Sequence, residues 1–159
     1  MKVAVVMGSA NDRPRMAPAL ETLASFGVEA TEHVLSAHRT PALVAELGAT
    51  ARQGGYGVMI CGAGMAAHLA GAVAAQTTLP VIGVPLSGGA IGGIDALYAT
   101  VQMPRGIPVA TVAIDGAANA ALLAVEILAV SDAGLAGRLD DYRRQWARAA
   151  SAPGAGAPA

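Results

Sequence analysis

The sequence predicts an α/β fold in which a parallel sheet lies between two layers of helices. Short β-branched runs alternate along the chain with stretches of helical length, and these stretches carry apolar residues along one face. Alternating units of this length favour a three-layer α/β sandwich. At 159 residues the chain is long enough for one domain that buries about two-thirds of its surface.

The strands of the sheet are predicted from five short runs that contain β-branched residues. In chain order these runs cover residues 3–7, 29–35, 58–61, 81–84 and 109–114. The sheet is therefore expected to have five strands, all parallel because a helical stretch separates each run from the next.

The helices are predicted from apolar positions that recur every three or four residues. The first is expected over 16–26, although Pro18 lies inside it and can shift its start. A second follows Pro41, a third follows the glycine turn within 57–75, and a fourth covers about 118–129. Ser131-Asp132 is typical of an N-cap and predicts a C-terminal helix over about 132–148, with Tyr142 and Trp146 on its apolar side. We expect one domain over 1–150 and a disordered Ala/Gly/Pro-rich tail over 151–159.

Composition limits both the core and the partners. Apolar residues make up 54% of the chain but aromatic residues only 3%, so Ala, Val, Leu and Ile must build the core. Each of these side chains buries little area, and we therefore expect further burial between subunits of a homo-oligomer. The formal charge of −1 gives no general attraction to nucleic acid or to an anionic membrane. An anionic ligand must then be held by a local site.

Cysteine content and hydropathy indicate a soluble, cytoplasmic protein. Cys61 is the single cysteine, which excludes an intramolecular disulfide and fits a reducing compartment. Met1-Lys2 leads directly into the first strand, with no signal-like segment before it. The most membrane-like window, 57–75, contains several glycines and His68, and is interpreted as strand, turn and helix instead of a membrane span.

Candidate chemistry is concentrated in four loops, each of which directly follows a predicted strand. They cover residues 8–12, 36–41, 62–68 and 85–95. In a parallel sheet the carboxyl ends of the strands meet at one edge, where ligands bind among loops and helix N-termini. We therefore expect the four loops to converge on one site.

The first loop has the character of an anion site. Gly8, Ser9 and Asn11 precede a helix whose free N–H groups and dipole favour a phosphate, and Asp12 can cap that helix or accept from a ribose hydroxyl. Ser9 and Asp12 are equally compatible with ordinary turn and cap roles. The loop matches neither the dinucleotide-binding nor the nucleoside-triphosphate glycine motif.

The second loop carries the residue most strongly indicated as catalytic. Thr40-Pro41 is a typical helix start, with Thr as N-cap and Pro at the first position. His38 and Arg39 are not needed for such a turn. An imidazole can exchange a proton near neutral pH, and the planar fork of Arg39 suits phosphate or carboxylate. A solvated loop histidine is the alternative interpretation of His38.

The third and fourth loops are rich in glycine. Gly62, Ala63 and Gly64 allow backbone to approach a flat ligand, whereas His68 is also compatible with an ordinary helix histidine. The fourth loop is interpreted as a lid, a subunit contact or a site of close packing. The three histidines and Cys61 lack zinc-site spacing, and neither a G-x-S-x-G motif nor a carboxylate pair occurs in the loops.

At these residues the sequence closely resembles the bacterial N5-carboxyaminoimidazole ribonucleotide mutase family of purine biosynthesis. The matching stretches extend from about residue 2 to the C-terminal helix. They comprise 6–9 with Asp12, the run Ser36-Ala37-His38-Arg39-Thr40-Pro41, 62–64 with 66–69, 93–98, 101–109 and 117–124.

The resemblance implies a flavodoxin-like sheet, a homo-octamer and a mutase that needs no ATP, metal or organic cofactor. By motif match, His38 would be the proton shuttle. The substrate would be held by the matching positions Ser9, Asn11, Asp12, Ser36, Ala37, Arg39, Gly62, Ala63, Gly64, Ala66, His68 and Leu69. Functional coupling to an N5-carboxyaminoimidazole ribonucleotide synthetase would supply the carbamate.

The sequence departs from the family pattern at a few positions. Met65 stands where the family usually has glycine, Ala70 where it usually has proline, and Asn11 where serine is common. The connection over 114–117 is short. The side chain of Met65 either narrows the pocket or points away into a neighbour.

Four other functions compete with the mutase. An aminoimidazole ribonucleotide carboxylase uses free CO2, but that branch lacks the His-Arg-Thr-Pro run. A nicotinate-nucleotide carboxylase of nickel-cofactor assembly shares the fold but typically carries an extra region before the first strand. A non-catalytic nucleotide-binding module would keep ligand binding after His38→Asn. A flavin-binding module is disfavoured because few aromatic residues can stack on the ring.

Overall fold

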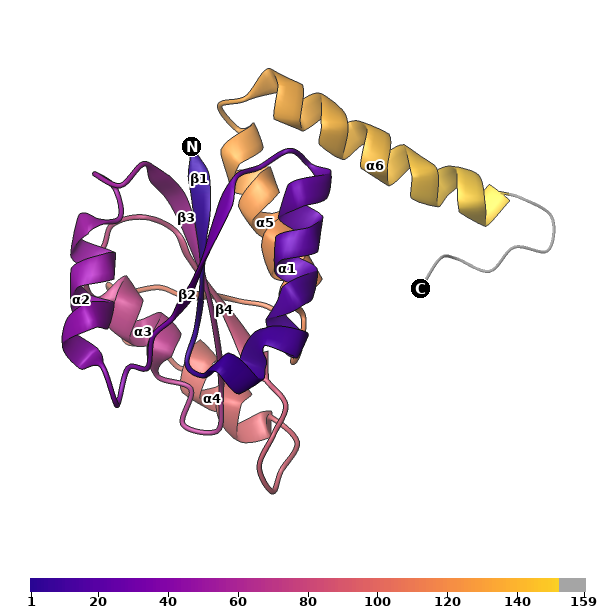
Figure 1. The fold of residues 1–159 in the computed structure, drawn as a ribbon. Helices are drawn as coiled ribbons and strands as arrows, with labels where there is room; N and C mark the ends of the chain where they lie inside the picture. Colours follow the sequence, from indigo (N-terminus) through magenta and orange to yellow (C-terminus); the bar gives the residue numbers. More distant parts are fainter. Residues whose placement is uncertain (152–159) are drawn as a thin grey trace.

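The structure is a computed structural model that describes the backbone of residues 1–151 and the side chains of residues 1–148. Its centre is a parallel sheet in the order β2-β1-β3-β4-β5 (Figure 1). The strands are β1 (Lys2–Met7), β2 (Ala30–Val34), β3 (Tyr56–Gly64), β4 (Val81–Leu86) and β5 (Ala110–Thr111). This is the flavodoxin-like strand order, so the predicted fold class is confirmed.

Helices follow each strand. A short 3-10 turn, η1 (Ala10–Asp12), leads into α1 (Arg13–Ser25). The others are α2 (Pro41–Thr50), α3 (Leu69–Ala74), α4 (Ile94–Val101), α5 (Ala117–Ala129) and α6 (Ala133–Ser151). In Figure 1 α1 and α5 cover one face of the sheet and α2 and α3 the other. Among these described helices, none is long and apolar enough to span a membrane.

Alternation along the strands separates two cores. Val3, Val5 and Met7 of β1 pack with α1 and α5, whereas Ala4 and Val6 pack with α2 and α3. Consecutive side chains point to opposite faces of a strand, and both faces of this sheet are covered. The central strands are consequently apolar along their whole length, as their sequence predicts.

The observed strands differ from the predicted ones near their ends. Gly62, Ala63 and Gly64, predicted as loop, are the last residues of β3 because they pair with Val84, Pro85 and Leu86. β4 likewise runs on to Leu86. The fifth strand was predicted over 109–114, but regular pairing covers only Ala110–Thr111. Beyond it, the chain still follows β4 through hydrogen bonds from Val112 N–H to Gly83 O and from Asp115 N–H to Pro85 O.

Two helices also differ from expectation. α1 begins at Arg13, before the predicted start, because Pro14 is well placed in a first turn and Pro18 is accommodated inside the helix. No helix was predicted where α4 lies, because its sequence shows only one short apolar face. A side chain at Gly83 would collide with Thr100, so the glycine allows α4 to approach β4 closely.

The last helix, α6, packs on the core through its first half and then extends away from the sheet (Figure 1). Asp132 caps it, accepting a hydrogen bond from Leu135 N–H at 2.9 Å. Leu135 is buried against the α1–α5 core, and Tyr142 meets Phe26 edge to face at 5.5 Å. α6 runs past the predicted end at residue 148 to Ser151. The rest of the segment predicted as disordered, 152–159, lies outside the described residues.

Candidate active site

A cleft of about 470 Å³ opens at the carboxyl edge of the sheet, where the four loops converge as predicted. Most of the predicted site residues line it: Ser9, Asn11, Asp12, Ser36, Ala37, His38, Arg39, Ala63, Gly64, Ala66 and Leu69. The lining also includes Gly8, Arg15, Met65, Ser87, Gly88 and Gly89. Gly62 and His68 are the two predicted residues outside the lining.

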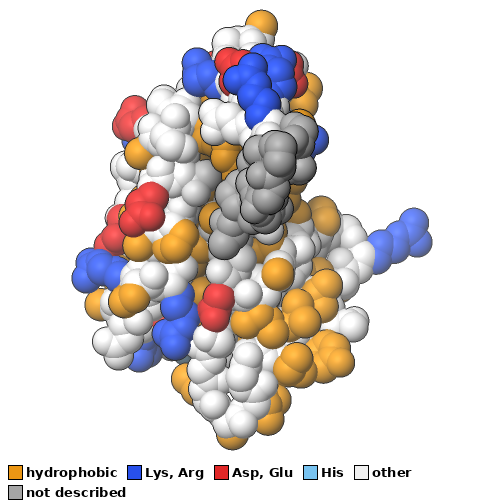
Figure 2. Space-filling view, turned by 90° about the vertical axis from the view of Figure 1, so that its right-hand side faces the viewer, with side chains coloured by type: hydrophobic (Ala, Val, Ile, Leu, Met, Phe, Trp, Pro, Cys, Tyr) orange, Lys and Arg blue, Asp and Glu red, His pale blue; other side chains and the backbone are white. Residues whose placement is uncertain are grey.

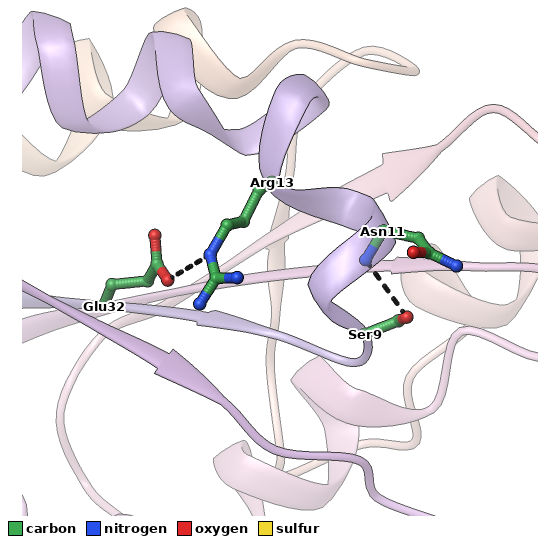
Figure 3. Close-up of polar contacts among 4 residues, drawn as sticks. All are labelled: Ser9, Asn11, Arg13 and Glu32. Atoms are coloured by element: carbon green, nitrogen blue, oxygen red, sulfur yellow. Dashed lines mark hydrogen bonds and ion pairs between the residues drawn. The ribbon is translucent and has the colours of Figure 1, made fainter.

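The first loop is held by its own turn. Ser9 lies at the N-cap of η1 and its Oγ accepts a hydrogen bond from Asn11 N–H at 3.2 Å (Figure 3). Arg13 points away from this turn and pairs with Glu32 of β2 at 2.7 Å. The Asn11 side chain points away from Arg13 and is one of the groups that line the cleft.

Asp12 occupies the N-cap position of α1 but its side chain makes no capping hydrogen bond. Burial raises the pKa of the Asp12 carboxyl, while the Ser9 backbone and the charges of Arg15 and Arg39 act in the opposite direction. The carboxyl group is thus left as an acceptor that faces the cleft.

The second loop is closed on itself by Ser36 and Thr40. Thr40 Oγ1 accepts from Ser36 N–H at 2.9 Å and donates to Ser36 O at 3.0 Å. Ser36 Oγ accepts from Arg39 N–H at 3.2 Å. Thr40 therefore holds the N-cap position of α2, as predicted, but its hydroxyl stabilises the loop instead of capping the helix.

Arg39 connects the first and second loops. Its Nη2 donates to Gly8 O at 2.8 Å, and the side chain is exposed at the cleft. A guanidinium has five N–H donors, so this contact leaves most of them available for an anion. Gly8 directly follows β1, which places the Arg39 charge beside the helix N-terminus that favours a phosphate.

His38 lies beside a second histidine. Its Nε2 is 2.8 Å from Nδ1 of His68, and the rings meet nearly at right angles. One imidazole must donate its N–H to the other, so a His38 ring protonated on both nitrogens needs an accepting Nδ1 on His68. Both side chains are exposed. His68, the residue immediately before α3, thus reaches the site through His38.

Gly62 and Cys61 lie inside the end of β3. A side chain at Gly62 would collide with Met16 of α1, which explains why glycine stands there. Burial raises the pKa of the Cys61 thiol to about 12. Cys61 is therefore an uncharged core residue next to the site.

Met65 has an unusual backbone conformation. Its φ is +52°, a left-handed value that favours glycine, and its side chain is 61% exposed. Met65 is one of the residues that line the cleft. Ala70 is buried in the first turn of α3, a position where proline is also tolerated.

The structure adds residues that the sequence did not single out. Arg15 Nε donates to Ser87 Oγ at 3.2 Å and lies 3.8 Å from Asp115 Oδ1. Asp115 Oδ1 also accepts from Ser87 N–H at 2.8 Å. The short connection after β5 therefore fixes the start of the fourth loop. The left-handed φ of Asp115, +57°, is tolerated by aspartate.

Across the described part of the chain, no three His, Cys, Asp or Glu side chains lie together as a metal site. The cleft instead combines the guanidinium groups of Arg15 and Arg39, the start of a helix and an exposed imidazole. This arrangement can bind an anionic ligand and exchange a proton with it.

A family model described as AIR carboxylase matches residues 2–149. The chain belongs to the AIR carboxylase family. The residues that line the cleft all fall inside the matched region, so the family relationship covers the whole candidate active site.

Named relatives and a solved structure are similar to the chain over most of its length. The chain is 51% identical over 147 residues to the N5-carboxyaminoimidazole ribonucleotide mutase of Vibrio vulnificus, covering 91% of each chain. It is 50% identical over 147 residues to the mutase of the same name from Pyrococcus abyssi, covering 92% of this chain and 84% of that one. The crystal structure of Treponema denticola PurE superposes with a TM-score of 0.82 at 28% identity, covering 92% of this chain and 91% of that one.

Proposed function

We propose that this protein is a mutase that converts N5-carboxyaminoimidazole ribonucleotide to 4-carboxy-5-aminoimidazole ribonucleotide in purine biosynthesis. The observation that carries the proposal is the cleft in which an exposed imidazole, His38, lies beside Arg39 and the start of α1. The names of the relatives that share half of this sequence support the same reaction.

The ribose phosphate would bind where the first two loops meet. Arg39 supplies a fixed positive charge, and the start of η1 and α1 supplies the positive end of a helix dipole. Ser9 and Asn11 add polar groups on the same side of the cleft. Asp12, an acceptor without a capping partner, suits a ribose hydroxyl. The end of β3, at Ala63 and Gly64, would then lie next to the aminoimidazole ring and its carboxylate, with Ser36, Ala37, Ala66 and Leu69 completing the walls.

His38 would act first as an acid and then as a base. The bond between N5 and the carboxyl carbon breaks, its electron pair stays on N5, and N5 takes a proton from His38. The released CO2 then accepts an electron pair from C4, and the C4 proton passes to His38 as the ring regains its aromatic state. The proton balance closes on one residue, a task suited to imidazole. Holding CO2 beside the ring makes the second step effectively intramolecular.

His68 would position His38 during this cycle. Its Nδ1 lies 2.8 Å from His38 Nε2 and can accept a hydrogen bond from the His38 ring when that ring is protonated on both nitrogens. The contact fixes the ring while charge appears on it, which a solvated loop histidine could not achieve.

A homo-oligomer, with the octamer as the specific expectation, is part of the proposal. Ile94, Tyr98 and Val101 share the outer face of α4 and are 45%, 62% and 46% exposed. Hydrophobic side chains also gather at the lower end of the space-filling view, the end where α4 lies in Figure 1 (Figure 2). An exposed apolar face of this kind favours burial against another subunit. A cytoplasmic location and coupling to a synthetase that makes the carbamate remain predictions.

The runner-up function is carboxylation of aminoimidazole ribonucleotide by free CO2, which the description of the matching family favours. The test supplies either the carbamate substrate, or aminoimidazole ribonucleotide with bicarbonate, without ATP and with a chelator present. Faster product formation from the carbamate than in an enzyme-free blank supports the mutase. Product only from the second mixture supports the carboxylase, and ligand binding without turnover on either supports a binding module.

A further inference from the structure

Met65 keeps a strained conformation at the mouth of the cleft. Among the described residues, only Met65 and Asp115 combine a side chain with a left-handed φ. Aspartate tolerates this region, but methionine has no side-chain group that stabilises it. Strain of this kind persists where the surroundings hold it and is concentrated at functional sites. The side chain of Met65 is therefore the feature to explain.

That side chain reaches from the end of β3 toward the fourth loop. A Cβ placed on Gly89 would lie 3.3 Å from Met65 Cγ and 3.8 Å from Met65 Sδ. Gly89, Gly92 and Gly93 all have left-handed φ values, so this loop passes close to Met65 in a conformation that glycine permits. The thioether thus lies between the two loops that border one side of the cleft.

Met65 is also the one large apolar group at the cleft surface. Of the lining residues described, only Met65 and Leu69 have apolar side chains larger than alanine, and Leu69 is 2% exposed. The other exposed lining residues are Asn11, Arg15, His38 and Arg39, which are polar or charged, and the small residues Ala66 and Gly89. CO2, the intermediate of the proposed reaction, is uncharged and has no hydrogen-bond donors. It is best confined by an apolar, adaptable side chain.

We propose that Met65 is an apolar cover that retains CO2 in the cleft between its release from N5 and its addition to C4. This inference rests on the proposed function and adds a residue to which the proposed function assigns no role. When CO2 escapes before C–C bond formation, the products are the free amine and dissolved CO2, and no carboxylated ring forms. Met65 would reduce that loss by closing the gap toward Gly89.

The test uses substrate labelled with 13C in its carbamate carboxyl group, in buffer with unlabelled bicarbonate. The division of the label between the carboxylated ring and dissolved CO2 is measured for wild type, Met65→Gly and Met65→Leu, each corrected for an enzyme-free blank. We expect wild type and Met65→Leu to retain the label, and Met65→Gly to lose it several-fold more often. Because glycine adopts this φ freely, Met65→Gly should also melt at a higher temperature, which shows that it is folded.

Equal label retention in Met65→Gly and wild type would overturn the inference, as would equal loss from Met65→Gly and Met65→Leu. If wild type makes no carboxylated product from the carbamate, the proposed function fails and the inference fails with it. If wild type turns over and only the label pattern disagrees, the mutase stands and the role of Met65 does not.

Discussion

His33 and His38 lie five positions apart but have opposite surroundings. His33, within β2, is bonded to hydroxyl groups: its Nε2 lies 3.1 Å from Tyr56 Oη and 3.3 Å from Thr31 Oγ1. Among the described residues, the side chain of His38, in the loop after β2, has the imidazole of His68 as its hydrogen-bond partner, and it faces the cleft. The first is held by groups that do not titrate near neutral pH, whereas the second is paired with a group that can accept its proton.

The neighbouring charged residues show the same contrast. Glu32, next to His33, is paired with Arg13 at 2.7 Å. Arg39, next to His38, donates to a backbone carbonyl and forms no close ion pair with a carboxylate among the described residues. A strand position that satisfies its polar groups internally serves stability, and a loop that leaves them available serves binding. The comparison predicts different outcomes for matched substitutions in the two regions.

The largest of these differences is expected for the two arginines. Arg39→Ala removes charge-assisted hydrogen bonds worth about 1.5–3 kcal/mol, so the Kd for the ribonucleotide should rise about 10- to 100-fold. Arg13→Ala breaks an exposed ion pair and should leave that Kd unchanged. Calorimetric titration of both variants measures this. Equal weakening by both would remove the distinction between the two regions.

A smaller effect is expected at His68. His68→Ala removes the acceptor that faces His38 Nε2, and a lost hydrogen bond of about 0.5–1.5 kcal/mol predicts a 2- to 10-fold lower kcat. His68→Asn can place a polar atom near the former Nδ1 and should recover part of the loss. Binding of the ribonucleotide should change little. An unchanged kcat and pH profile in His68→Ala would mean that the contact has no positioning role.

The fold was largely predictable because strand and helix periodicity is local. β1 to β4 follow from their short β-branched runs, whereas the flavodoxin-like arrangement of the sheet was expected from the family resemblance. β5 was overestimated because its sequence shows apolar character but not where pairing with β4 stops. α4 was missed because its approach to the sheet depends on Gly83 and Thr100, residues 17 positions apart.

The site was predictable in its loops but not in its contacts. His38 and Arg39 could be selected because the helix start at Pro41 does not require them. The pairing of His38 with His68 could not be predicted, because these residues are 30 positions apart and follow two different strands, β2 and β3. Arg15 reaches the cleft only because α1 begins at Arg13. The sequence shows that Met65 is unusual, but its left-handed backbone depends on the path of the chain after β3.

His33 should affect stability and not catalysis. Burial, and then the charge of Lys2, lower the pKa of His33 below its ordinary 6.5. In the unfolded chain His33 keeps its ordinary pKa, so on acidification it is protonated there before it is protonated in the folded protein. The free energy of unfolding of the wild type should therefore fall as the pH drops from 7 to 5. His33→Asn should lose part of this pH dependence and about 1 kcal/mol of stability at pH 7. Urea unfolding at both pH values, with wild type as reference, measures the difference, and parallel pH dependence in the two proteins would contradict it.

The smallest effect is expected for alkylation of Cys61 in the native protein, because this residue is close to the site in sequence but buried. With a thiol pKa of about 12 and 1% exposure, it should resist iodoacetamide at pH 8 in the native protein. The same reagent should label it fully in urea. Mass spectrometry distinguishes the two states, and rapid native labelling would show that the end of β3 opens.

The central claim is that His38, and not His33, exchanges the proton during carboxylate transfer. The direct test is the initial rate of 4-carboxy-5-aminoimidazole ribonucleotide formation by His38→Asn and His33→Asn under identical conditions, each corrected for an enzyme-free blank. General acid–base catalysis contributes about 10²- to 10⁴-fold, so His38→Asn should be slower than wild type by at least that lower factor while His33→Asn keeps its rate. Comparable rates in the two variants would contradict the account.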